Sequence, residues 1–388
     1  VTGYSRMDQM IGERESEKEL ADRIQREYDI AVRHEENEGR LVFSVQEDGQ
    51  LSALKLMPRA AAMRRNPQTV SAGRPPCMAD IERVETKLLA FATPITHCRE
   101  AAMRKLISGA LAYQNQARVP LCLIDSLQEG LCESLPGAEL MRQLGFQYIY
   151  DRPSYALNTE TISVEMLERA AGGETVSLDI PDTTLQVAAG EDLLSLAHFV
   201  NARLCRQYGF FMIRSASYYE GVQKRLLGAG GNLFQIMEHG IRRGYFACAG
   251  TAADSIREAV FDPAFDRECY ILTEKGNTPA VMARIVNLPE MLRYVTGNGR
   301  ITIAVRLKDP AVAGNDGLFI WYIDEKGSRM ERVEAPDGAM EKEPSMRPEV
   351  TTTIGEFTAF IFEYMKLKQS AKFDSIYLAG PVSVNDIY

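Results

Sequence analysis

The chain has 388 residues, more than one hydrophobic core usually supports, so we expect two or three domains. Hydrophobic residues make up 45% and charged residues 25%, which excludes a disordered or fibrous chain. The net charge of -9 disfavours nucleic acid as a partner, because phosphate binding depends on clustered Lys and Arg. The seven Cys show no C-x-x-C spacing and the four His are dispersed, so the sequence predicts neither a disulfide framework nor a metal site.

The sequence contains no stretch typical of a signal peptide or of a membrane span. Residues 1–14 lack an apolar core followed by a cleavage site. No apolar run approaches the roughly 20 residues that a spanning helix needs. We therefore expect a cytoplasmic protein without a membrane partner.

The first 150 residues predict an α+β arrangement. Glu47-Asp48-Gly49 predicts the turn of a hairpin, and a Pro- and Arg-rich stretch, 57–76, follows its second strand. The expected helices are 15–28 and 99–116, and the expected strands are 41–45, 51–56, 86–93, 119–124 and 146–150. This order is not the alternation of a doubly wound fold.

The rest of the chain repeats this mixture. Gly172-Gly173 predicts the end of a helix, and Glu238-His239-Gly240 predicts a turn between strands 233–237 and 245–249. Further apolar segments are 193–208 and 218–227, and later strands are 301–307, 318–323 and 329–333. Thr353 and Glu356 form a capping-box pattern, which predicts a helix packed on the last sheet.

Three segments resemble a known family. They are Ala283-Arg284-Ile285-Val286-Asn287-Leu288-Pro289, Leu378-Ala379-Gly380-Pro381-Val382, and Leu144-Gly145-Phe146 with the seven residues that follow. They are similar to segments of the enhanced intracellular survival family of GNAT N-acetyltransferases. The resemblance implies an α+β fold with two GNAT-like domains, 1–155 and 156–279, followed by a sterol-carrier-like α/β domain, 280–388. It also implies that the second domain has no catalytic duty and that the protein forms a homo-oligomer.

The resemblance places acetyl-CoA at the end of one strand and the start of the next helix. GNAT enzymes hold the pyrophosphate on backbone amides at a helix N-terminus, where the partial positive charge favours anions. The corresponding residues here are Ala90, Phe91, Ala92, Arg99, Glu100, Ala101, Ala102 and Met103. Cys98 stands where the family has Arg, Ala101 where it has Gly, and Glu100 adds a negative charge. The alternative is that 99–116 is only an amphipathic core helix.

The resemblance also assigns the acid and the base. Met141 aligns with the family's general acid, a Tyr, but has no transferable proton. Strand alternation predicts that Tyr148 and Tyr150 share one face and favours the core for both; the alternative is that one of them replaces the acid. The family's base is its terminal carboxylate, which makes Tyr388 the candidate here; the alternative is an ordinary frayed terminus.

These assignments imply an acetyl-CoA-dependent N-acetyltransferase acting on a small-molecule or peptide amine. The alternative is a catalytically inactive GNAT-scaffold pseudoenzyme that serves as a ligand-binding or assembly module. In the tail, Phe319 and Trp321 either line an apolar pocket or belong to the core, and the alternation of a half-buried strand favours the core.

Overall fold

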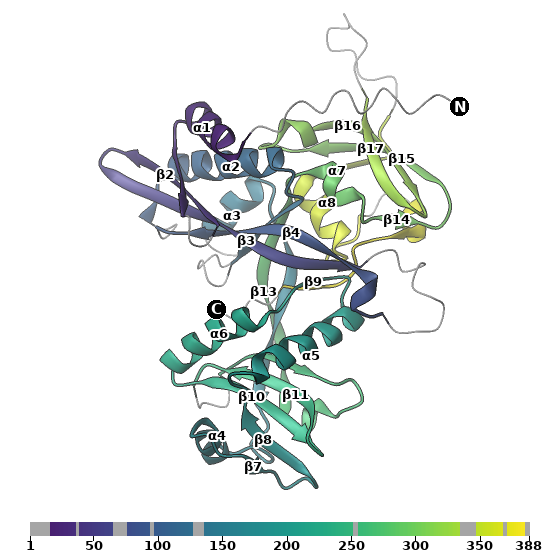
Figure 1. The fold of residues 1–388 in the computed structure, drawn as a ribbon. Helices are drawn as coiled ribbons and strands as arrows, with labels where there is room; N and C mark the ends of the chain where they lie inside the picture. Colours follow the sequence, from purple (N-terminus) through teal and green to yellow (C-terminus); the bar gives the residue numbers. More distant parts are fainter. Residues whose placement is uncertain are drawn as a thin grey trace, which may run out of the picture.

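The structure is a computed structural model that describes residues 16–35, 39–64, 76–93, 97–126, 136–250, 255–333, 347–367 and 371–384. A sheet of 14 strands runs through the molecule, and a sheet of 4 strands belongs to the tail. Figure 1 shows three lobes, with α1–α3 on one, α4–α6 on the second and α7–α8 on the third. The fold is mixed α/β and rich in sheet.

The first lobe contains the elements of residues 17–157. They are α1 (Glu17–Tyr28), β1 (Ala31–Glu35), β2 (Arg40–Glu47), β3 (Gln50–Arg64), η3 (Met78–Asp80), β4 (Ile81–Phe91), α2 (Glu100–Gln116), β5 (Leu121–Asp125), α3 (Pro136–Gln143) and β6 (Gln147–Leu157). One core joins α1 and α2 to the sheet, with Ile24, Phe43 and Leu106 fully buried in it. The predicted helix 99–116 is confirmed as α2.

The hairpin prediction is confirmed, but its second strand is longer than the predicted 51–56. Asp48 and Gly49 have φ of 49° and 81° and connect β2 to β3. β3 then continues through residue 64, well into the Pro- and Arg-rich stretch 57–76. Pro58 is tolerated because it follows the segment paired with β2 and precedes the segment paired with β9, where one edge of β3 has no strand partner among the described residues.

The second lobe is built from residues 164–285. Its elements are α4 (Val164–Ala171), β7 (Val176–Ser177), β8 (Thr183–Val187), α5 (Asp192–Gln207), β9 (Phe210–Met212), α6 (Ala216–Gly228), β10 (Asn232–Glu238), β11 (Ile241–Cys248), β12 (Ile256–Phe261), η5 (Arg267–Cys269) and β13 (Ile271–Ile285). The predicted turn at His239-Gly240 is confirmed, with φ of 49° and 75°. α5 and α6 cover a core that includes Tyr219 and Tyr245.

Two long strands belong to both lobes. β13 pairs with β6 along most of its length, and residues 281–285 of β13 also pair with β5. The strand order β4-β5-β13-β6-β12 therefore continues from the first lobe into the second without a break. The division at 155 and 279 stays a prediction, since strands run across both positions.

The tail forms the third lobe. Its elements are α7 (Leu288–Leu292), β14 (Thr296–Gly297), β15 (Ile301–Lys308), η6 (Ala313–Asn315), β16 (Gly317–Asp324), β17 (Gly327–Arg332), β18 (Val350–Thr353), α8 (Ile354–Ile361), η7 (Ala371–Ser375), β19 (Ile376–Tyr377) and β20 (Val382–Ser383). The capping box of Thr353 and Glu356 is confirmed at the start of α8. Trp321 is fully buried and its ring lies 5.3 Å from that of Phe357, which confirms the core interpretation.

The segments that carry the family resemblance connect the lobes. Arg284 of β13 is completely buried, and its guanidinium donates to the Leu144 carbonyl oxygen and to the Asp309 carboxylate. Gly145 has φ of 84°, and a Cβ there would lie 2.6 Å from the Arg284 guanidinium. In the last segment, the Pro381 carbonyl accepts from Gly209 N–H at 2.9 Å, beside the parallel pair β20–β9. These segments hold the architecture together.

Candidate cofactor site

The sheet of the first lobe parts between β4 and β5. The two strands pair in parallel only through Lys87 with Cys122 and Leu88 with Leu123. On its other edge, β4 stays paired with β3 as far as Phe91. Residues 89–91 thus have no partner strand on the β5 side within the described chain. Two predicted cofactor residues, Ala90 and Phe91, lie on this edge, and Ala92 follows it with its N–H donating to Ala53 O at 3.0 Å.

The start of α2 presents backbone amides. Arg99 is the N-cap residue, with extended φ and ψ of -71° and 139°, and its side chain makes no capping bond. Met103 N–H donates to Arg99 O at 3.1 Å, so the amides that precede it in the helix, Glu100 to Ala102, are those for which an α-helix supplies no acceptor. Ala101 is exposed, whereas the side chains of Ala102 and Met103 are buried and fix the helix on the sheet.

The β2–β3 turn holds the segment that precedes α2. Asp48 forms an ion pair with Arg99, and the Gln50 side-chain amide donates to the His97 carbonyl oxygen. Both partners of the Asp48–Arg99 pair are largely exposed, and such pairs contribute little to stability. A phosphate at the start of α2 could therefore replace Asp48 as the partner of Arg99.

Glu100 lies at the same helix start and adds a negative charge. Its carboxylate accepts from Arg104 Nε at 2.8 Å, an i,i+4 pair on the exposed face of α2. The Arg104 guanidinium offsets part of this charge. The start of α2 thus offers backbone amides to an anion, and the Glu100 carboxylate opposes the binding of one.

The side chain at the expected acid position, Met141, has no proton to donate. Met141 is fully buried in the core of the first lobe, together with Tyr148. Tyr150 packs instead against the core of the tail, so the prediction that Tyr148 and Tyr150 share a face is wrong. The reason is a bulge: neighbouring residues Val281 and Met282 pair with Tyr150 and Tyr148, which leaves one extra residue on β6.

An ion pair at the end of β5 was not anticipated from the sequence. Asp125 is almost completely buried, and Arg152 Nη2 lies 2.9 Å from its Oδ2. Asp125 pairs in register with Val281, which in turn pairs with Tyr150 on β6. The available signal was a carboxylate that directly ends the apolar run 121–124, a position where strands often present functional groups.

The predicted base, Tyr388, lies outside the described residues. The last described segment places Val382 and Ser383 in a parallel pair with Phe210 and Phe211, between the second lobe and the tail. Gly380, with φ of 78°, turns the chain into this pair. The assignment of the terminal carboxylate as base stays a prediction.

Two kinds of feature are absent from the described part of the chain. No group of three or more His, Cys, Asp or Glu side chains is arranged to hold a metal ion there. Among the described helices, none combines the length and the apolar character required to cross a bilayer.

Several solved structures share this fold. A GCN5-related N-acetyltransferase from Anabaena variabilis matches with a TM-score of 0.53 and 12% identity, over 87% of this chain and 84% of that one. A protein of unknown function from Enterococcus faecalis, described as a probable N-acyltransferase, matches with 0.56 and 14% identity over 90% and 89%. Eis1 from Mycobacterium abscessus matches with 0.51 and 11% identity over 88% and 84%. No family model and no curated protein matches the chain. At these identities the likeness shows that the chain has the fold of GNAT N-acetyltransferases over nearly all of its length.

Proposed function

We propose that the protein is an acetyl-CoA-dependent N-acetyltransferase whose transfer site lies in the first lobe, between the parted ends of β4 and β5. Two features of the first lobe together carry this proposal. Residues 89–91 of β4 have no strand partner on the β5 side, and the amides of Glu100 to Ala102 have no side-chain cap. The likeness to GNAT structures supports it. The acceptor would be an amine of a small molecule or peptide.

Each part of the site has a defined task in this proposal. Bound acetyl-CoA supplies an acetyl group on a thioester. The amides of Glu100 to Ala102 donate to the pyrophosphate oxygens, and Arg99 adds a cation beside them. The free edge of β4 offers backbone groups to the amides of the pantetheine arm. The carboxylate of Tyr388 accepts the proton of the attacking amine.

The remaining assignments extend the proposal to the whole protein. Residues 280–388 would form a sterol-carrier-like domain, and the four-stranded sheet covered by α8 supports that assignment. We also propose that the protein works in the cytoplasm as a homo-oligomer. Sedimentation of the full chain tests the oligomer, since a single species at the mass of one chain would contradict it.

Calorimetric titration with acetyl-CoA tests the cofactor site, with variants that change charge at helix starts. Ala101→Glu places a carboxylate among the proposed phosphate-binding amides, yet Glu is favourable in the first turn of a helix, so the fold should survive. Binding should weaken at least about tenfold, since like-charge juxtaposition costs several kcal/mol. Glu100→Gln should instead tighten binding severalfold, because it removes a charge that opposes phosphate.

Ser217→Glu is the control, since it also introduces a carboxylate at the second residue of a helix, α6 in the other lobe. It should leave the affinity for acetyl-CoA unchanged. If acetyl-CoA gives no heat with the unmodified protein, or if all three variants bind it equally, the cofactor site is not at α2.

A second candidate function is a pseudoenzyme that binds ligands on the GNAT scaffold without transferring acetyl. The burial of Met141 in the core favours it, because no hydroxyl occupies the position of the family's acid. The two functions differ in turnover. Acetyl-CoA binding without release of CoA thiol across a panel of diamines, amino sugars and peptides would support the pseudoenzyme, and thiol release would support the transferase.

A further inference from the structure

The large sheet parts a second time, in the second lobe. β12 meets β6 through one register pair, Ile256 with Tyr155, and then diverges from it. The other edge of β12 stays paired with β11 as far as Phe261. A cavity of about 390 Å³ lies in this gap, and its lining includes the end of α5 and Ser383 of the tail. All three lobes therefore contribute to its walls.

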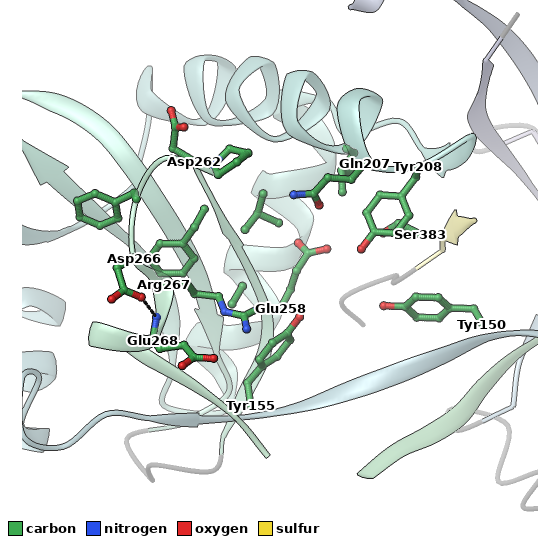
Figure 2. A pocket seen from close by; sticks show the side chains of 16 residues that line it. Tyr150, Tyr155, Gln207, Tyr208, Glu258, Asp262, Asp266, Arg267, Glu268 and Ser383 are labelled. Atoms are coloured by element: carbon green, nitrogen blue, oxygen red, sulfur yellow. Dashed lines mark hydrogen bonds between the residues drawn. The ribbon is translucent and has the colours of Figure 1, made fainter. Parts of the chain in front are cut away.

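Three tyrosine hydroxyls point into this cavity. Figure 2 shows Tyr150, Tyr155 and Tyr208 turned toward a common space, which the Glu258 carboxylate and the Arg267 guanidinium flank. None of the three hydroxyls has a hydrogen-bond partner within the part of the chain that the structure describes. Burial raises the pKa of Tyr155 to about 12 and also raises the pKa of Tyr150 and Tyr208. All three therefore stay neutral at physiological pH, each able to donate one hydrogen bond and to accept others.

The charge of the cavity wall is negative. It carries four carboxylates, Glu258, Asp262, Asp266 and Glu268, and one guanidinium, that of Arg267. Two of these carboxylates have cationic partners outside the cavity lining. Arg214 Nη2 lies 3.0 Å from Glu258 Oε1, and Arg203 Nη2 lies 2.7 Å from Asp262 Oδ2.

Glu258 is the most enclosed of the four. It is 4% exposed and also accepts from the Tyr245 hydroxyl. Arg214 and Tyr245 therefore fix the carboxylate, which also borders the cavity. The two negative charges of Asp266 and Glu268 exceed the single positive charge of Arg267. An incoming cation thus meets acceptor oxygens and a surplus of negative charge, whereas an anion meets a single guanidinium among carboxylates.

We propose that the gap between β12 and β6 is a binding site for a small organic cation of the primary-amine class, separate from the acyl-transfer site. The ammonium group donates to the tyrosine oxygens and to Glu258, and the tyrosine rings form the apolar wall for its carbon part. The volume is at the low end of the range for ligand pockets, which fits a molecule of one ring or a short chain.

Three probes of nearly the same shape test the charge of the ligand: benzylamine, benzyl alcohol and benzoate. Their binding to the full chain is measured by titration calorimetry and by saturation-transfer NMR, neither of which depends on catalysis. Benzylamine should bind at least about tenfold more tightly than either other probe, since each 1.4 kcal/mol of difference is a factor of ten. Equal binding of benzylamine and benzyl alcohol, stronger binding of benzoate, or no binding by benzylamine overturns the proposal.

Two substitutions locate the probe in this cavity. Tyr155→Phe removes one hydroxyl while keeping the ring, and should weaken benzylamine about two- to tenfold, the usual range for one hydrogen bond. Arg267→Gln removes the like charge and should tighten benzylamine severalfold. Weaker benzylamine binding in Arg267→Gln, or unchanged binding in Tyr155→Phe, contradicts the assignment. Each variant is first shown to keep the circular dichroism spectrum and the melting temperature of the parent.

The matched control separates this site from the proposed transfer site. Ala101→Glu should weaken acetyl-CoA binding at least about tenfold but leave the affinity for benzylamine unchanged, because α2 contributes no residue to the wall of this cavity. Loss of benzylamine binding in that variant would place the amine in the transfer site and overturn the proposal of a separate site. Failure of acetyl-CoA to bind the parent protein refutes the transferase proposal and leaves the amine test valid.

Discussion

Arg284→Met should be among the most destabilising substitutions in this protein. The guanidinium is completely buried and shares its hydrogen bonds between Asp309 of the tail and the Leu144 carbonyl of the first lobe. Asp309 also accepts from Ala311 and Val312 N–H, both at 2.9 Å, and keeps these bonds in the variant. It loses the cation that compensates its charge. Removing one partner of a buried ion pair costs about 3 to 5 kcal/mol, because the other charge stays buried without compensation.

Tryptophan fluorescence provides the assay for this substitution. Trp321 is the one tryptophan of the chain, and it lies in the same core as Ile285, the neighbour of Arg284. Urea unfolding followed at this residue should show a loss of about 3 kcal/mol or more in Arg284→Met. Arg329→Met, which breaks a pair with Glu331 on the exposed surface of the tail sheet, should cost less than about 1 kcal/mol.

The double variant Arg284→Met/Asp309→Asn separates the ion pair from lost packing. Neutral Asn keeps an oxygen for the two N–H donors, so the double variant should be more stable than the sum of the single changes by about 1 to 3 kcal/mol. The reasoning is refuted if Arg284→Met unfolds at the same urea concentration as Arg329→Met, or if the two single changes are additive.

Two further predictions concern packing and pH. Gly209→Ala would place a Cβ 1.8 Å from the Ala379 carbonyl oxygen, so it should displace the last segment and cost about 3 kcal/mol of stability in the same urea assay. A Cβ at Gly228 would have nothing within 4 Å, so Gly228→Ala should be neutral or stabilising by up to about 1 kcal/mol. Equal urea midpoints for the two variants would contradict this. Burial raises the pKa of Tyr113 from 10.0 to about 12, so the folded state holds this proton more tightly than the unfolded state. The stabilisation of the folded state by this proton is therefore complete below pH 10 and is lost as the pH rises toward 12. This pKa shift corresponds to roughly 2 to 3 kcal/mol of stability. Tyr113→Phe should therefore reduce the fall of the urea midpoint between pH 10 and 12. An identical fall in both proteins would show that Tyr113 is not its cause.

The sequence was sufficient for features that depend on neighbouring residues. The β2–β3 turn needs two residues of positive φ, which Asp48-Gly49 supplies, and the start of α8 needs the side-chain exchange between Thr353 and Glu356. Each of these two features depends on a segment of at most four residues. The core position of Trp321 also followed from simple alternation along one strand.

The features that the sequence did not predict depend on pairing between distant segments. β3 extends past Pro58 because β4 pairs along its whole length, and strand β6 places Tyr148 and Tyr150 in different cores because β13, more than 100 residues away, forces a bulge. The second parting of the sheet has the same origin, since it requires β12 to diverge from β6. No local pattern in either strand indicates it.

The segments that carry the family resemblance explain why the fold was easier to predict than the site. Leu144 and Gly145 contact Arg284, and Pro381 contacts Gly209, so these residues join lobes. The residues at the start of α2 are constrained differently, since a ligand there uses backbone amides that many side chains can accompany. The differences from the family's motif at residues 98–101 are therefore compatible with the proposed cofactor site.

Hydrogen–deuterium exchange with and without acetyl-CoA tests the central claim most directly, because it reads the backbone amides on which the cofactor site is built. The account predicts that acetyl-CoA slows exchange in the segments containing 89–91 and 100–102 and leaves 256–268 unchanged. Protection confined to 256–268, or no protection in either region at saturating acetyl-CoA, would contradict a transfer site between β4 and β5.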